Sequence, residues 1–117
     1  MHKVIHIKPV GGRTEYDLPT LGHIVSSFGL GTSLIVDGRA GSIRVGEGDD
    51  YEFIESDEDF RHFQFDHLPE HLKVVSRQFY DVAEWMVLTL PVCRQRTVAL
   101  QQLLVAKDAA VRARLTN

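Results

Sequence analysis

The chain has 117 residues, of which 44% are hydrophobic and 25% are charged, and its formal net charge is −3. This length suits one compact domain, or a small domain joined to a helical hairpin, and the negative charge disfavours a general DNA- or RNA-binding protein. Its apolar runs are too short for a signal peptide or for the roughly 20 residues of a membrane span. The single cysteine, Cys93, excludes an internal disulfide and fits a reducing compartment. We therefore expect a cytoplasmic protein with no nucleic-acid or membrane partner.

The two halves of the chain differ in charge. Residues 1–59 carry five Lys and Arg against eleven Asp and Glu, whereas residues 60–117 carry eight against five. The acidic run at residues 47–59 is typical of a solvated loop or sheet edge. The positive C-terminal half either attracts an anionic ligand or offsets the acidic half within an oligomer.

Short β-strands are expected in the first half. Residues 3–8 alternate between apolar and polar side chains, and residues 9–12 (Pro-Val-Gly-Gly) break this pattern. A short helix is predicted at residues 18–28, and the Asp-Gly-Arg sequence at residues 37–39 is typical of a hairpin turn. Three further segments resemble β-strands: 32–36, 42–45 and 51–54. The sequence thus predicts an α+β fold in which residues 1–62 form a small antiparallel β-meander.

The second half predicts two long helices, one over residues 68–90 and one over residues 94–115. Apolar side chains recur every three or four residues in both. Pro69 suits the first turn of the first helix, and Pro91 cannot continue it. The second helix carries two apolar seams: Leu100, Leu104, Val111 and Leu115 form one, and Ala99, Leu103, Ala106, Ala110 and Ala113 form the other. A lone hairpin cannot cover both seams, so we expect residues 63–117 to form a helical hairpin domain that oligomerises through the second.

One end of this hairpin has the parts of a nucleotide pocket. The outer ends of an antiparallel hairpin meet, so the entry segment 61–67 should lie near Arg112. Aromatic side chains stack bases, and arginine forks and helix N-termini bind phosphate. We expect Phe65, with Phe63 as the alternative, to stack a base, with His67 beside it. The alternation of Phe63 and Phe65 is also typical of a linker anchored to the core.

The bend of the hairpin is the second candidate region. Arg94, Arg96 and Thr97 begin the second helix, where positive side chains are electrostatically unfavourable. Their presence indicates that they contact a ligand phosphate or the acidic segment of a neighbouring protomer. The alternative is that these arginines are simply exposed to solvent. We expect Arg96 and Arg112 to contact the phosphates of the ligand. The two arginines would come from different protomers if the bend of one protomer lies beside the entry segment of another.

No pattern of catalytic or metal-binding residues stands out. The histidines His62, His67 and His71, together with Asp66, match no established metal spacing. No histidine is paired in sequence with Cys93 to activate its thiol. We therefore expect no enzyme, no metal and no cofactor.

The C-terminal half also resembles a known family. The run Phe63-Gln-Phe-Asp-His-Leu-Pro-Glu-His-Leu precedes a helix and a proline-marked bend, and Arg94-Gln-Arg-Thr-Val-Ala-Leu-Gln-Gln-Leu follows. This resembles the helical hairpin domain shared by phage anti-CBASS and anti-Thoeris sponge proteins, and the small β-region ahead of it is similar in layout to the anti-Thoeris branch.

The resemblance implies a phage anti-defence protein that acts in the host cytoplasm. Such proteins bind and sequester a cyclic oligonucleotide or a cyclic ADP-ribose derivative without catalysis. They assemble into homo-oligomers, often hexamers, with pockets between protomers. The alternative is an oligomeric helical interaction module that has no small-molecule ligand.

Overall fold

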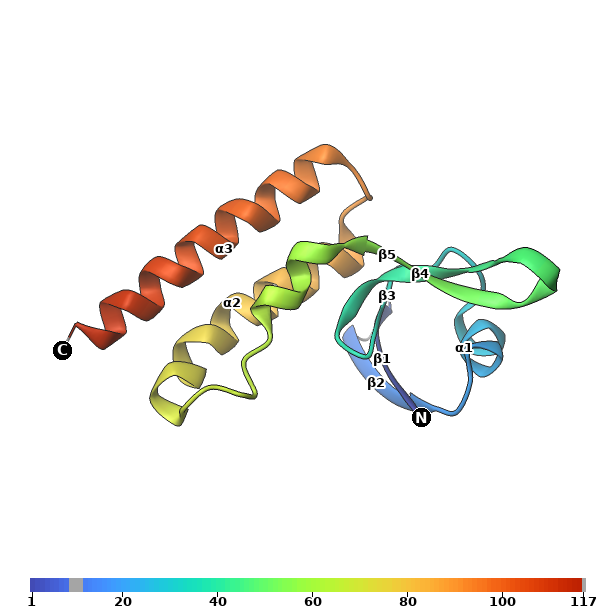
Figure 1. The fold of residues 1–117 in the computed structure, drawn as a ribbon, viewed down its shortest axis with the longest axis horizontal. Coiled ribbons are helices and arrows are strands. Elements are labelled where there is room, and N and C mark those ends of the chain that lie inside the picture. The colour runs from blue at the N-terminus through green and yellow to red at the C-terminus, as the bar shows by residue number, and fades with distance from the viewer. Residues whose placement is uncertain (9–11, 117) are drawn as a thin grey trace.

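The computed structural model describes residues 1–8 and 12–116, and its elements form three layers (Figure 1). A short helix, α1 (Leu21–Phe28), lies on one side of a sheet, and the pair α2 (Glu70–Thr89) and α3 (Arg94–Leu115) lies on the other. The sheet consists of β1 (His2–Lys8), β2 (Gly12–Leu18), β3 (Leu34–Val36), β4 (Arg39–Val45) and β5 (Tyr51–Asp57). Two short 3-10 helices, η1 (Glu47–Asp49) and η2 (Glu58–Phe63), flank β5. The predicted α+β class and the helical pair are confirmed.

The strand order differs from the predicted meander. All neighbouring strands are antiparallel, in the order β2-β1-β3-β4-β5. β1 is therefore an inner strand, with Val4 opposite Tyr16 of β2 on one side and Val36 of β3 on the other. β2 was not predicted, and the expected break at residues 9–11 lies outside the described part of the chain.

The predicted hairpin turn joins β3 to β4. Asp37 and Gly38 both have positive φ, 52° and 83°, as a two-residue turn that matches the strand twist requires. The turn is also tied to β1, because the Asp37 N–H donates to the Lys3 carbonyl at 2.9 Å and the Asp37 carboxylate accepts from the Lys3 N–H at 3.0 Å. This tie places the turn beside the start of the chain.

The core has two parts, one on each face of the sheet. Successive side chains of a strand point to opposite faces, so Val4 packs toward α1 while Ile5 packs toward the helical pair. The cluster under α1 contains Val4, Ile24, Leu34, Val36 and Ile43. The cluster under the helices contains Ile5, Ile35, Ala40, Phe60, Phe63, Tyr80, Ala83, Val87 and Leu100. Sheet and helices therefore share one cluster, which crosses the boundary predicted at residue 62.

The packing of α3 corrects the predicted division into two seams. Leu100 is fully buried, and Leu103 packs on the same core although it was assigned to the oligomer seam. Leu115, which was assigned to the same seam as Leu100, is 57% exposed. η2 packs against both long helices, and the part of α3 that faces this core includes Leu100, Leu103 and Leu104. Among residues 1–8 and 12–116, no helix is long and apolar enough to span a membrane.

Candidate ligand-binding groove

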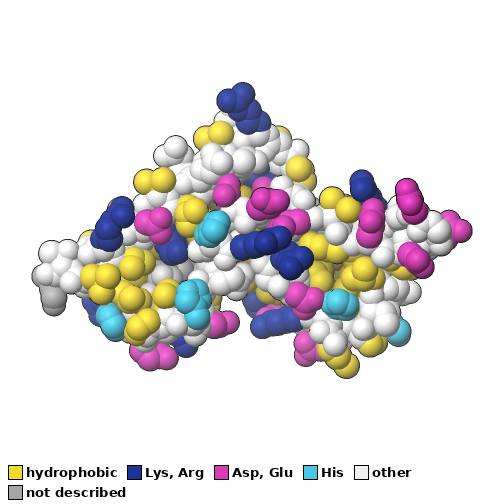
Figure 2. Space-filling view, viewed as in Figure 1, with side chains coloured by type: hydrophobic (Ala, Val, Ile, Leu, Met, Phe, Trp, Pro, Cys, Tyr) yellow, Lys and Arg dark blue, Asp and Glu magenta, His cyan; other side chains and the backbone are white. Residues whose placement is uncertain are grey.

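A cavity of about 510 Å³ lies where the sheet meets the start of the helical half. Its walls come from β1, the β3–β4 turn, η2 and the segment that leads into α2. Figure 2 shows Lys and Arg side chains gathered where these two halves of the molecule meet, and acidic side chains at the far end of the β4–β5 hairpin. The polar and aromatic side chains that line the cavity are Lys3, Arg13, Asp37, Arg39, Arg61, Gln64, Phe65, Asp66 and Tyr80.

Four of these side chains are cationic, and three of them already have acidic partners. Arg61 donates to Glu55 from Nε at 2.7 Å, and Lys3 Nζ lies 3.1 Å from Glu15. Arg13 binds both Glu15, at 3.1 Å, and Glu84. No ion pair to Arg39 is found within the described residues, so Arg39 is the cation most available to an anionic ligand.

The pairing of Arg13 fixes one wall of this cavity. Glu84 of α2 is only 4% exposed, and it accepts two hydrogen bonds from the Arg13 guanidinium of β2, one of them at 3.3 Å. Hydrogen bonds from Arg13 and then from Lys3 lower the pKa of Glu15, so this carboxylate remains charged. These contacts hold the edge of the sheet against α2.

Two aromatic side chains lie at the inner end of the cavity. The ring of Phe65 meets that of Tyr80 edge-on, with centroids 5.2 Å apart. Burial, followed by the nearby Glu84 carboxylate, raises the pKa of Tyr80, so its hydroxyl stays protonated. Phe65 is half-buried and is the predicted site residue that this structure places in a cavity.

The β3–β4 turn forms the opposite rim. The Gln64 side chain donates to the Gly38 carbonyl at 3.4 Å, which holds the entry segment against the turn. Burial alone would raise the pKa of Asp37, but hydrogen bonds from the His2 ring and the Lys3 N–H lower it below its usual value. The Asp37 carboxylate is thus occupied by the start of β1, and Arg39, two residues later, carries the free charge.

A second cavity of about 530 Å³ adjoins the first and shares Arg13, Phe65 and Tyr80 with it. Its outer wall is a face of α2 that carries Arg77, Asp81 and Trp85. The two cavities together form one groove along the junction between sheet and helices, which we call the junction groove.

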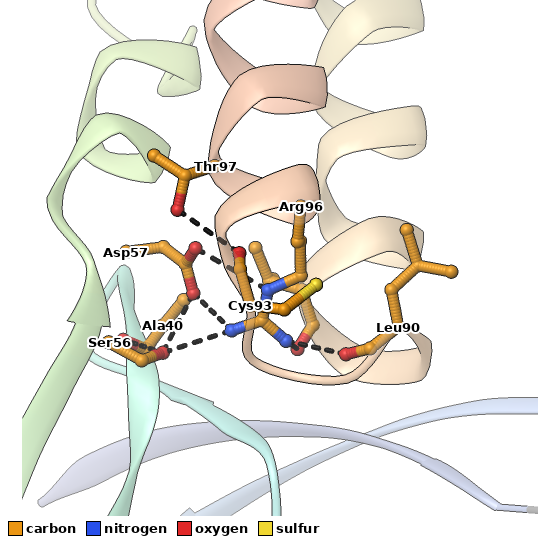
Figure 3. A network of polar contacts seen from close by, with 8 residues as sticks. Ala40, Ser56, Asp57, Leu90, Cys93, Arg96 and Thr97 are labelled. Atoms are coloured by element: carbon orange, nitrogen blue, oxygen red, sulfur yellow. Dashed lines mark hydrogen bonds and ion pairs between the residues drawn. The ribbon is translucent and has the colours of Figure 1, made fainter.

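Arg96 lies outside this groove and is not available to a ligand. It is 2% exposed, and its guanidinium donates to the Asp57 carboxylate and to the Leu90 carbonyl, the latter at 2.6 Å (Figure 3). It also donates to Ser56 Oγ and to the Val87 carbonyl, both at 3.3 Å. The predicted phosphate contact is therefore corrected: Arg96 joins the end of β5 to both long helices. A positive charge at the start of α3 is tolerated because Asp57 neutralises it.

Phe63 is likewise a core residue. It is fully buried, and its ring centroid lies 6.5 Å from that of Phe60. The sequence allowed two interpretations of Phe63 and Phe65: base stacking, or anchoring of the linker to the core. Phe63 is a core anchor, and of the two side chains Phe65 is the one that lines the cavity.

The remaining predicted residues are exposed and are not brought together in one copy. His67 lies in the turn before α2, Arg94 and Thr97 lie in the first turn of α3, and Arg112 lies near its end. At 1.5 Å per residue, the α3 backbone places Arg112 roughly 27 Å from Arg94. The entry segment also meets the middle of α3, not its end, because Lys107 Nζ donates to the His62 carbonyl at 2.9 Å.

Sequence reasoning missed most of the junction groove. Arg13 belongs to the strand that was not predicted, and Arg39 was seen only as part of a turn. The helical spacing of Arg77, Asp81 and Trp85 was a usable signal, since residues four apart share a helix face. Comparisons with protein-family models, with curated proteins and with solved structures found no match to this chain.

Proposed function

We propose that this protein binds and sequesters a cyclic nucleotide signal, either a cyclic oligonucleotide or a cyclic ADP-ribose derivative, without converting it. The observation that carries the proposal is the junction groove, in which cationic side chains face an accessible aromatic ring. Arg39 offers a free guanidinium for a phosphate, and Phe65 offers a ring for a base. The resemblance of the hairpin to phage sponge proteins supports sequestration over catalysis and favours the host cytoplasm as the place of action.

The size of the groove supports the same class of ligand. Small-molecule sites usually measure about 300–1,000 Å³, and each of the two cavities falls within this range. The lining of each cavity combines aromatic side chains with several charged groups, which is what bases and phosphates require. A cyclic dinucleotide carries two bases and two phosphates, and the two adjoining cavities offer places for both.

Assembly into a homo-oligomer is part of the proposal. Val98 and Val105 lie on the outer side of α3 with 38% and 61% of their surface exposed, and Val74 of α2 is 62% exposed. Exposed apolar side chains on one helical layer favour a protein interface. A second copy on this layer would cover them and would be able to bring Arg94 or Arg112 to the groove, which one copy does not do.

The test is a measurement of stability and of ligand fate. A ligand that binds only the folded state at a hundredfold excess over its Kd adds about 2.7 kcal/mol to the free energy of unfolding. We expect one or more of cyclic di-GMP, cyclic di-AMP and cyclic ADP-ribose to raise the Tm, and chromatography after denaturation to return the ligand unchanged. A ligand returned in altered form would contradict sequestration, and no response to any of them would contradict the proposal.

A matched pair of variants locates the site. Arg39→Ala should weaken binding about tenfold to a hundredfold, the equivalent of one hydrogen bond to a charged group. Arg44→Ala is the control, because Arg44 lies on the same strand and, among the described residues, its ion-pair partner is the exposed Glu52 at 2.9 Å. Equal affinity of both variants would place the ligand elsewhere.

The second candidate function is an oligomeric interaction module without a ligand. The exposed valines of α2 and α3 favour it equally well. If light scattering shows an oligomer and no cyclic nucleotide changes the Tm of the protein, the interaction module is selected over the nucleotide-sequestering protein.

A further inference from the structure

The second cavity of the junction groove has a different chemistry from the first. Arg77, Asp81 and Trp85 line it from one face of α2, spaced by four residues so that their side chains lie one above the next. The first cavity holds four cationic side chains against two acidic ones. The second holds three acidic side chains against two cationic ones, so the two ends of the groove suit different parts of one ligand.

Within the described residues, Arg77 and Asp81 have no ion-pair partner. The other charged groups of this cavity do: Glu84 and Glu15 both bind Arg13. The Asp81 carboxylate is therefore a free acceptor, and the Arg77 guanidinium a free donor. They stand one helical turn apart on a wall that the Arg13–Glu84 pair holds in place.

Trp85 adds a stacking surface to this wall. It is the single tryptophan of the chain and is 52% exposed. An indole has a large apolar face that gains from being covered, and bases stack on such faces. Phe65 also lines this cavity.

We propose that the second cavity is a guanine subsite. In it, Trp85 stacks the base, Asp81 accepts hydrogen bonds from the N1–H and the N2 amino group of guanine, and Arg77 donates to O6. Adenine fits this wall less well, because beside its N6 amino group it presents the N1 acceptor to the carboxylate. The inference rests on the proposed function in one respect: the phosphates of the ligand lie in the first cavity, next to Arg39.

Trp85 itself reports on this cavity, so fluorescence titration with GMP and AMP tests the proposal. We expect GMP to quench the emission saturably, with an affinity about fivefold to a hundredfold higher than that of AMP, as a bidentate base contact gives. Asp81→Asn should abolish this preference. Asp50→Asn, which removes the same charge at the far end of the β4–β5 hairpin, should retain it.

The guanine subsite would be overturned by equal quenching by GMP and AMP, or by a preference that Asp81→Asn leaves unchanged. Absence of saturable quenching by either nucleotide would also overturn it. Cyclic di-AMP and cyclic di-GMP, assayed by Tm, keep the two proposals apart. A gain in Tm without guanine preference supports sequestration alone, whereas guanine preference without any gain from a cyclic nucleotide supports the subsite alone. Circular dichroism checks that each variant is folded.

Discussion

Among the residues that the structure describes, Arg96 has the most buried charged side chain, and replacing it by methionine tests its role. The substitution keeps most of the side-chain volume but removes every donor of the guanidinium. It leaves the Asp57 carboxylate, whose side chain is 3% exposed, without its cationic partner. The carbonyls of Val87 and Leu90 lose the donor that now satisfies them at the bend between α2 and α3.

The size of the loss follows from these contacts. Breaking a buried ion pair by removing one partner costs about 3–5 kcal/mol, mostly because the remaining charge stays buried. A domain of this size has about 5–15 kcal/mol of total stability. Arg96→Met should therefore remove at least about a fifth of the stability, and most of it if the domain lies near the lower end of that range. The double variant Arg96→Met/Asp57→Leu should recover about 2 kcal/mol or more relative to the sum of the single changes, because no charge is then buried.

Urea unfolding followed by circular dichroism gives these free energies. Arg94→Ala is the control, since Arg94 is exposed in the same turn of α3 and surface substitutions usually change stability by less than about 0.5 kcal/mol. A loss below about 1 kcal/mol for Arg96→Met, on the scale of an exposed pair, together with lost nucleotide binding, would refute this reasoning. It would restore Arg96 as a ligand contact.

Three further predictions concern the core, a tight strand contact and pH. Phe63→Ala should cost about 3–5 kcal/mol as a buried aromatic, whereas Phe65→Ala should cost less stability and weaken cyclic nucleotide binding about tenfold to a hundredfold; equal stability losses in urea would contradict the assignment. Gly41→Ala should lower the Tm sharply, because a Cβ there would lie 2.1 Å from the Ile54 carbonyl oxygen; a wild-type Tm would disprove this contact. Burial and then Lys8 lower the pKa of His6 below 6.5, so the unfolded chain binds the proton first and stability falls as pH drops below about 6.5. His6→Gln should flatten that part of the pH profile of urea unfolding, and an unchanged profile would assign it to another group.

Local patterns were sufficient to predict most of the elements. The second long helix was predicted at residues 94–115 and is observed at those residues, and the first was predicted at 68–90 and runs over Glu70–Thr89. The turn at Asp37 and the strand that begins the chain were also predicted correctly. Helical periodicity, proline positions and turn residues act within a few neighbours, so the sequence alone contains these signals.

β2 was missed because its pattern is weak. It is an edge strand in which Thr14, Tyr16 and Leu18 alternate with the charged Arg13, Glu15 and Asp17, but only Leu18 is strongly apolar and most of the residues are exposed, so the signal of a half-buried strand is faint. Its pairing with β1 depends on backbone hydrogen bonds that any sequence offers. The inner position of β1, between β2 and β3, depends on α1 carrying the chain from one side of β1 to the other, which is a property of the packed fold.

The sequence by itself determined the α+β class and the long helical pair, and it singled out Phe65 as a candidate site residue with Phe63 as the alternative. Only the tertiary structure decided which charges are free. Arg96 pairs with Asp57, 39 residues away, and Arg13 pairs with Glu84, 71 residues away, whereas Arg39 has no such partner among the described residues. Whether a charged side chain is a structural contact or a ligand contact depends on partners brought close by folding, and spacing along the chain does not contain that information.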